Sequence, residues 1–214
     1  RPAGGADGAG HRDRRGREKS VRYWIMTVRD GAFRPTPEVD EVRWVPLSSA
    51  AREVSYPGDR AVLDAIEPAL RALILLVRHG RAGDRDEWAG DDRLRPLDKR
   101  GRRQADAMVA PLAGYALSRL VSSPYVRCVQ TLEPLSARLG LPVEHDPAIS
   151  EGVPVEKARG LIDRLGPGPV VLCTHGDVVE ALVGEDEPKK KGSTWLLARR
   201  NGAVEPVRYW PPLA

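Results

Sequence analysis

The spacing of hydrophobic and polar positions changes near residue 72 and divides the chain into two parts. Beyond that point, short continuous apolar runs alternate with segments whose apolar residues recur every three or four positions. Continuous runs are typical of buried strands in a parallel sheet, and the wider spacing is typical of amphipathic helices. Residues 72–214 are therefore predicted to form an α/β domain, a three-layer, mostly parallel sheet with flanking helices.

Each predicted element of this domain has a local signal. Apolar runs mark the strands, helical spacing marks the helices, and Gly140 stands where a helix would close. The dipeptide Asn201-Gly202 is typical of a turn between two hairpin strands. We predict strands at residues 73–77, 118–124 and 169–176, helices at 98–115, 126–141 and 177–184, and a terminal hairpin at 193–210.

The pattern before residue 72 is less regular. Residues 1–20 hold mainly Gly, Arg and Asp, and their few apolar side chains cannot bury enough surface to offset the chain entropy lost on folding. We therefore expect a disordered tail there. The remainder of this part predicts a strand at Val21–Val28, a second strand at Glu41–Leu47 and a helix that follows Pro57 and ends near Leu70.

Composition and charge are those of a soluble globular protein. Apolar residues make up 41% and charged residues 30%, and no apolar run approaches the roughly 20 residues of a membrane span. Cys128 and Cys173 lack CxxC spacing, which favours neither a disulfide scaffold nor a zinc site and fits a reducing cytoplasm. The net charge of +4 permits an anionic ligand. Because the Arg residues are dispersed and no nucleic-acid-binding motif is present, we expect no nucleic-acid partner. From the preceding observations we also expect a cytoplasmic protein without a membrane partner.

Two histidines follow apolar strands in the same way. His79 and His175 each end a strand and are each followed by Gly, and Arg78 precedes the first of them. In open α/β sheets, ligands bind beyond the carboxyl ends of the strands. A single histidine after a strand is more often a hydrogen-bonded structural residue. The pair, with an arginine beside it, instead indicates one shared pocket.

Five segments in a fixed order carry a resemblance to a known family. Arg78, His79 and Gly80 follow the first apolar strand, and the later segments are RPLDKRGRRQA (95–105), SSPYVRCVQT (122–131), ISEG (149–152) and CTHGDVV (173–179). Together they resemble the signature of the histidine phosphatase superfamily, in its compact SixA-like branch. The resemblance covers residues 73–214 and implies the histidine phosphatase fold and a metal-independent phosphatase.

The resemblance also implies roles for four side chains. His79 would be the nucleophile, whose neutral imidazole attacks phosphorus and forms a phosphohistidine. Arg78 and Arg127 would bind phosphate, since a planar guanidinium group can hold two oxygens at once. His175, which matches the second histidine of the family, would serve both catalysis and phosphate binding. No metal and no cofactor are expected for this domain.

A proton must reach the leaving oxygen, and the attacking water must later lose one. Glu151 in the ISEG segment is the predicted acid and base for these steps. The alternative for Glu151 is a solvated loop carboxylate, and Asp177 is a weaker substitute for the role.

Residues 21–71 resemble the last third of a Nudix hydrolase domain. DEVRWVPLSSA (40–50) looks like its late strand, and YPGDRAVLDAI (56–66) looks like its closing helix. The Nudix box, whose glutamates hold Mg²⁺ against a pyrophosphate, is absent from the sequence. We therefore expect a truncated Nudix-like segment without Nudix activity, with Mg²⁺ as a cofactor only if an intact box lies upstream.

The combination of the two parts resembles two-domain MutT-like proteins, which act on 8-oxo-guanine nucleotides and dinucleoside polyphosphates through their Nudix half. The segments AGDDRLRPLDKRG (89–101) and KGSTW (191–195) are close to segments of that group. Lys190, Lys191 and Ser193 are candidate secondary phosphate contacts on this basis, with a solvated basic turn as the alternative.

Three functions are consistent with the sequence. The first is a metal-independent phosphatase that acts through a phosphohistidine on a small phosphorylated substrate or nucleotide, in the context of 8-oxo-guanine nucleotides or dinucleoside polyphosphates. The second is a remnant of a Nudix-type 8-oxo-(d)GTP or polyphosphate hydrolase. Its C-terminal domain would then be a non-catalytic phosphate-binding or interaction module, and a Nudix domain of a neighbouring chain is a candidate partner. The third is a protein phosphohistidine phosphatase.

Overall fold

A computed structural model describes most of the chain and divides it into two compact units, Arg1–Leu70 and Arg71–Ala214. The described residues are 3–7, 11–12, 18–19, 22–25, 33–45, 47–71, 73–166, 168–200 and 203–213. Within these ranges, no helix is both long enough and apolar enough to cross a bilayer.

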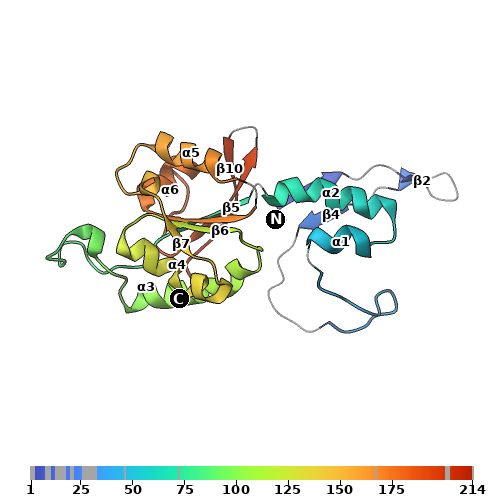
Figure 1. Cartoon of the computed structure of the whole chain (residues 1–214), viewed down its shortest axis with the longest axis horizontal. Helices are drawn as coiled ribbons and strands as arrows, with labels where there is room; N and C mark the ends of the chain where they lie inside the picture. The colour runs from blue at the N-terminus through green and yellow to red at the C-terminus, as the bar shows by residue number, and fades with distance from the viewer. Residues whose placement is uncertain are drawn as a thin grey trace. The chain divides into compact units, whose positions relative to one another are not determined.

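A six-stranded mixed sheet forms the centre of the C-terminal unit, with the strand order β10-β9-β5-β8-β6-β7 (Figure 1). Its strands are β5 (Leu73–Arg78), β6 (Arg119–Ser122), β7 (Val143–His145), β8 (Val170–Thr174), β9 (Thr194–Arg200) and β10 (Ala203–Trp210). The pairs β5–β8, β8–β6 and β6–β7 are parallel, and β9 pairs antiparallel with both β5 and β10. The predicted α/β fold with a mostly parallel sheet is confirmed.

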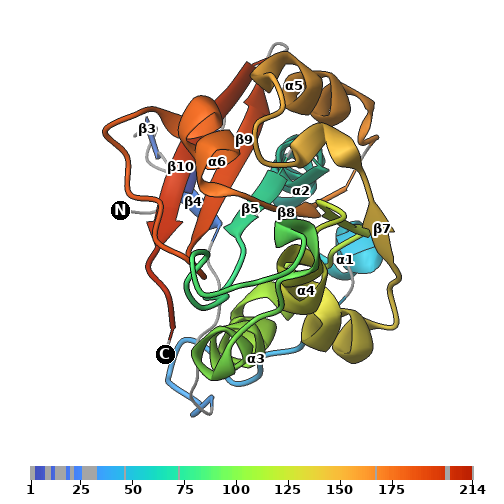
Figure 2. The same ribbon diagram turned by 90° about the vertical axis from the view of Figure 1, so that its left-hand side faces the viewer.

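Helices cover both faces of this sheet, with α3 and α4 on one face and α5 and α6 on the other (Figure 2). The helices are α3 (Lys99–Ala113), α4 (Val126–Leu139), α5 (Val155–Arg164) and α6 (Gly176–Val183), with the 3-10 turns η1 (Asp92–Leu94) and η2 (Pro147–Ile149). Gly140 closes α4 at a φ of 68°, in the left-handed region that Gly adopts without strain. The sequence did not predict β7 or α5.

Strands β5 and β8 lie in the middle of the hydrophobic core. Ile74, Leu76 and Leu172 are completely buried, and they pack in one cluster with apolar side chains of α5 and α6 such as Leu161 and Val179. Burial on both faces explains why these strands are continuous apolar runs. The core thereby fixes the backbone up to the point where each strand ends.

The N-terminal unit contains two small antiparallel pairs and two helices. Strand β1 (Ala3–Asp7) pairs with β4 (Arg22–Ile25), β2 (His11–Arg12) pairs with β3 (Glu18–Lys19), and the helices are α1 (Leu47–Glu53) and α2 (Pro57–Arg71). Where the sequence predicts a disordered tail, the structure thus describes short strands, because β4 supplies a pairing partner for β1. The other residues of the predicted tail lie outside the described residues, and the Nudix-like character of 21–71 stays a prediction.

The strand predicted at Glu41–Leu47 is wrong. Residues 41–45 form no strand, and Leu47 begins α1. The side chains of Val42 and Trp44 are 51% and 81% exposed. An apolar β-branched run becomes a strand only where it finds a partner and a surface to cover, and none of the described strands pairs with this one.

Gly101, in the first turn of α3, allows this helix to approach the loop that follows β5. A Cβ atom at Gly101 would lie 1.9 Å from the carbonyl oxygen of Arg81. That oxygen also accepts a hydrogen bond from the backbone N–H of Asp98, at 3.0 Å. The Asp98 side chain in turn accepts from the N–H of Gly101 at 2.8 Å, capping the helix. The loop after β5 is therefore fixed to the start of α3.

We expect Gly101→Ala to lower the free energy of unfolding by about 1–3 kcal/mol, because the backbone must move to relieve the overlap. Gly160→Ala in α5 is the matched control, since its Cβ would meet only the flexible Arg164 guanidinium at 3.4 Å and Ala is favoured in helices by about 1 kcal/mol. Urea unfolding followed by circular dichroism measures both. Equal effects of the two substitutions would contradict the close packing at Gly101.

Candidate active site

The pairing of β5 with β8 places His79 and His175 side by side. Arg78 lies opposite Thr174 in this parallel pair, so the next residue of each strand is a histidine at the same edge of the sheet. The two ring centroids are 5.3 Å apart, and both side chains are buried. The carboxyl ends of parallel strands are the usual place for a ligand site.

The hydrogen bonds of His79 define which ring nitrogen carries the proton and which carries the lone pair. Its Nδ1 lies 2.7 Å from the carbonyl oxygen of Gly80, which can only accept, so Nδ1 carries the proton. Arg127 Nε donates to His79 Nε2 at 3.3 Å, which requires a lone pair on Nε2. Burial lowers the pKa of His79 well below its ordinary value, although the bond to Gly80 acts to raise it, and electrostatic repulsion from His175, Arg127 and Arg78 lowers it further. His79 is therefore a neutral imidazole with its Nε2 lone pair directed toward Arg127.

Arg127, in the first turn of α4, is held by acceptors on several sides. Its side chain is only 1% exposed. Nη1 donates to the backbone oxygen of Asp92 at 2.7 Å, and Nη2 lies 3.0 Å from Asp92 Oδ2 and 2.9 Å from Glu151 Oε2. Its guanidinium carbon also lies 4.7 Å from the centroid of the Tyr125 ring. A buried guanidinium needs such partners, and together they fix its orientation.

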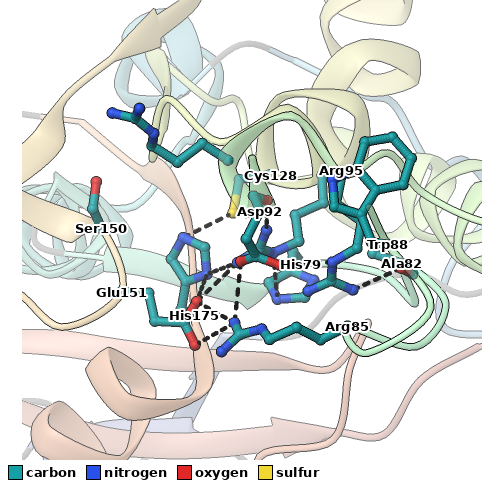
Figure 3. A network of polar contacts seen from close by, with 12 residues as sticks. His79, Ala82, Arg85, Trp88, Asp92, Arg95, Cys128, Ser150, Glu151 and His175 are labelled. Carbon is teal, nitrogen blue, oxygen red and sulfur yellow. Dashed lines mark hydrogen bonds and ion pairs between the residues drawn. The ribbon is translucent and has the colours of Figure 1, made fainter. Parts of the chain in front are cut away.

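Asp92 is held in turn by Arg95, whose side chain is also buried. Arg95 Nε donates to Asp92 Oδ1 at 2.8 Å, and its Nη1 donates to the carbonyl oxygen of Ala82 at 2.7 Å (Figure 3). Burial acts to raise the pKa of Asp92, but Arg95, Arg127 and Arg85 outweigh it and hold the pKa below its ordinary value. The carboxylate of Asp92 therefore stays charged and anchors Arg127.

Glu151 lies between two guanidinium groups in the turn after η2. Arg85 Nη2 donates to both of its carboxylate oxygens, at 2.9 and 2.7 Å, and Arg127 Nη2 donates to Oε2 at 2.9 Å. Oε2 is 3.9 Å from His175 Nδ1. Figure 3 shows the carboxylate beside His175 and Arg85. The structure thus brings Glu151 to the same site as both histidines.

His175 is oriented from the side opposite to Glu151. Its Nε2 lies 2.9 Å from Ser123 Oγ and 3.5 Å from Cys128 Sγ, and the Tyr125 ring meets it edge-on at 4.6 Å between centroids. Ser123 follows β6 and Cys128 belongs to α4. The end of β6 and the start of α4 therefore fix the ring of His175.

Arg78 lies at the edge of the site against the start of α6. A Cβ atom at Gly176 would be 2.8 Å from the Arg78 guanidinium carbon, so this packing requires Gly. Arg78 Nη1 donates to the carbonyl oxygen of Lys189, and its buried Nε has no hydrogen-bond partner among the described residues. Burial lowers the pKa of Arg78 from its ordinary value.

Of the predicted site residues, Arg78, His79, Glu151 and His175 line a pocket of about 420 Å³, and Arg127 does not. Of the secondary candidates, Lys191 lines the pocket, whereas Lys190 and Ser193 do not. Lys190 is exposed, and Ser193 is buried with an unpaired Oγ. The lining residues are Arg78, His79, Arg81, Gly83, Asp84, Arg85, Arg95, Glu151, His175, Gly176 and Lys191.

The sequence interpretation missed Asp92, Arg95, Arg85 and Ser123 as members of the site. Asp92 and Arg95 lie in the segment AGDDRLRPLDKRG, and Ser123 lies in SSPYVRCVQT. Both segments supported the family resemblance, but their individual polar side chains were given no role. Arg127 was predicted only to bind phosphate; its burial, which requires a carboxylate partner, was not predicted. Among the described residues, no cluster of three or more His, Cys, Asp or Glu could hold a metal ion.

The buried, neutral His79 predicts a loss of stability in acid. Its pKa in the folded chain lies below the unfolded value of about 6.5, so the unfolded chain binds the proton more readily. The stabilisation is complete above about pH 6.5 and is lost as the pH falls below it. Urea unfolding should therefore show a smaller decrease in stability from about pH 7 to about pH 5 for His79→Asn than for the wild type.

The control for this comparison is His145→Asn, at an exposed position at the end of β7. It should show the same decrease as the wild type. If His79→Asn also shows the full decrease, the neutral form of His79 does not contribute to stability.

Comparison with known proteins agrees with this geometry. Residues 74–153 match the model of the histidine phosphatase superfamily (branch 1). The chain is 37% identical over 211 residues to the 8-oxo-(d)GTP phosphatase of Mycolicibacterium smegmatis, a match that covers 91% of this chain and 66% of the relative. The chain thus spans slightly less than two thirds of that protein's length.

Two SixA-type proteins are also similar. The chain is 29% identical over 133 residues to the phosphohistidine phosphatase SixA homolog of Haemophilus influenzae, covering 54% of this chain and 79% of the relative. The solved structure of the protein histidine phosphatase SixA complexed with tungstate aligns with a TM-score of 0.56 at 24% identity, over 65% of this chain and 97% of that one. The sheet order, the two histidines at its edge and the match over residues 74–153 lead to one conclusion: the C-terminal unit of this chain has the histidine phosphatase fold.

Proposed function

We propose that residues 71–214 act as a metal-independent phosphatase that transfers a phosphoryl group from a small phosphorylated substrate to His79 and then to water. The hydrogen bond from Arg127 Nε to His79 Nε2, at 3.3 Å, is the observation that carries this proposal. It holds a fixed positive charge beside a nitrogen lone pair. A phosphorus atom approached by Nε2 has its oxygens within reach of the same guanidinium group.

The reaction proceeds in two displacements at phosphorus. In the first, the hydrogen bond from Arg127 Nε to His79 Nε2 breaks, the freed lone pair attacks phosphorus and the P–N bond forms. The leaving oxygen departs with the electron pair of the broken P–O bond. In the second, water attacks the phosphohistidine, the P–N bond breaks, and inorganic phosphate leaves. The hydrogen bond from Nδ1 to the Gly80 carbonyl keeps the ring oriented and stabilises the positive charge that the phosphorylated ring carries.

Arg78, Arg127 and His175 surround the transferred group in this scheme. Their N–H groups stabilise the charge on the equatorial oxygens, and they are fixed before the substrate arrives. Glu151 is the proposed acid and base, because its carboxylate lies beside the pocket and 3.9 Å from His175 Nδ1. In the free site its oxygens bind Arg85 and Arg127, so an arriving phosphate must take over the bond to Arg127.

We favour a nucleotide as the substrate, because the chain is similar to the M. smegmatis protein named 8-oxo-(d)GTP phosphatase. The SixA homolog supports a phosphohistidine-containing protein as the second candidate. A third candidate is a module that binds phosphate without turnover. These three make different demands on His79, because only the first two require it as a nucleophile.

We expect the intact chain to hydrolyse p-nitrophenyl phosphate, 8-oxo-GDP or a phosphohistidine peptide in the presence of EDTA. His79→Asn should reduce this hydrolysis by about 10³-fold or more, because removal of a nucleophile leaves only the binding contribution. His145→Asn, which changes an exposed histidine outside the pocket, is the control and should retain it. The preferred compound distinguishes the nucleotide from the protein substrate.

Hydrolysis that stops in EDTA would contradict the metal-independent reaction. Hydrolysis that persists in His79→Asn would show that another group is the nucleophile. Tight phosphate binding without any hydrolysis would favour the binding module.

A further inference from the structure

The pocket holds more positive charge than one phosphoryl group needs. Carboxylates already pair with three of its arginines, since Arg85 pairs with Glu151, Arg95 with Asp92, and Arg81 with Asp98 through Nε alone. The proposed phosphatase uses Arg78, together with Arg127 behind the pocket, for the transferred group. The remaining cations that line the pocket are Arg81 and Lys191.

Lys191 has no anionic partner of its own. Its ammonium group forms no hydrogen bond or ion pair with any residue that the structure describes. Burial, and then the charges of Arg78, Arg95, Arg81 and Arg127, lower the pKa of Lys191. An anion beside the ammonium would relieve this repulsion. Arg81 pairs with Asp98 through Nε at 3.1 Å. The Arg81 side chain is 52% exposed, and the residue lines the pocket.

The backbone carrying these two cations is fixed to the nucleophile. The buried Gln104 accepts a hydrogen bond from the N–H of Arg81 at 3.0 Å and donates to the carbonyl oxygen of Lys191 at 3.3 Å. The next residue, Gly192, donates to the carbonyl oxygens of both Arg78 and His79, at 3.0 Å each. The backbone at Lys191 and Arg81 is therefore held at a defined place relative to His79, and their exposed side chains extend from it into the pocket.

The pocket has room for a second anionic group. Its volume is about 420 Å³, and pockets of roughly 300–1,000 Å³ hold whole small-molecule ligands. We propose that Lys191 and Arg81 form a second anion subsite beside His79, which binds the phosphate that is not transferred, so that the substrate is a phosphoanhydride ending in a diphosphate. This inference rests on the proposed function and specifies its substrate class.

The chemistry of a diphosphate suits the free site. Nε2 of His79 attacks the terminal phosphorus, the P–N bond forms, and the P–O bond to the bridging oxygen breaks. The bridging oxygen keeps the electron pair and becomes part of a phosphate group held by Lys191 and Arg81; water then cleaves the P–N bond and releases inorganic phosphate. A leaving phosphate, with a pKa of about 6, departs without a proton. For this substrate class Glu151, whose two oxygens both accept bonds from guanidinium groups, is needed only as the base that takes a proton from the attacking water.

The test compares the binding of inorganic pyrophosphate with that of inorganic phosphate, by isothermal titration calorimetry of the intact chain in EDTA. The matched variants are Lys191→Met and Lys190→Met, which remove equal charges from adjacent residues, one lining the pocket and one outside it. We expect pyrophosphate to bind the wild type at least about tenfold more tightly than phosphate, as one additional charged hydrogen bond provides. Lys191→Met should remove most of this preference, and Lys190→Met should keep it.

The second subsite is overturned if both anions bind with equal affinity, or if Lys190→Met loses as much pyrophosphate affinity as Lys191→Met. The second result would mean that net surface charge alone attracts the anion. Arg81→Met provides an independent variant and should also reduce the preference. The titrations are repeated in the His79→Asn background, in which pyrophosphate is not turned over by the proposed route. Failure of the subsite is thereby separated from failure of the proposed phosphatase, which the His79→Asn assay detects.

Discussion

The hydrogen bond between Arg127 and His79 is the contact on which the rest of the site depends. It requires a neutral imidazole, which the burial of His79 supplies, and the Nδ1–H bond to Gly80 leaves the lone pair on Nε2. It also requires a buried guanidinium group, which is costly without anionic partners. Asp92 and Glu151 are those partners, and Arg95 holds Asp92 in place. The site is therefore one connected network rather than a set of separate residues.

The same network explains how a free site can remain stable while it is prepared for an anion. In the free chain, the Glu151 carboxylate satisfies Arg127 and Arg85. A bound phosphate brings oxygens of the same charge and similar geometry to Arg127. When a phosphate oxygen replaces the Glu151 carboxylate, the Arg127 guanidinium group stays paired with an anion. The site therefore needs little rearrangement to bind phosphate. Lys191 differs from these arginines, because no described residue provides it with an anion to exchange.

Local patterns in the sequence predicted the elements that carry the chemistry. β5 and β8 are buried on both faces and therefore appear in the sequence as continuous apolar runs, and a site histidine directly follows each of them. Asp92 and Arg95 were not predicted as site residues because η1 is a three-residue turn without periodicity, and its contact with Arg127 joins residues far apart in the chain. The strand expected at Glu41–Leu47 failed for a related reason: strand propensity does not reveal whether a partner strand exists.

The most direct test of this account is the identification of the phosphorylated atom. The intact chain would be mixed with its substrate, denatured in alkali within milliseconds to seconds, and analysed by peptide mass spectrometry. The account predicts a phosphate on the peptide containing His79, stable in alkali and lost in acid, as a phosphorus–nitrogen bond is. A phosphate on another residue, or hydrolysis at full rate with no phosphopeptide at any time, would contradict it.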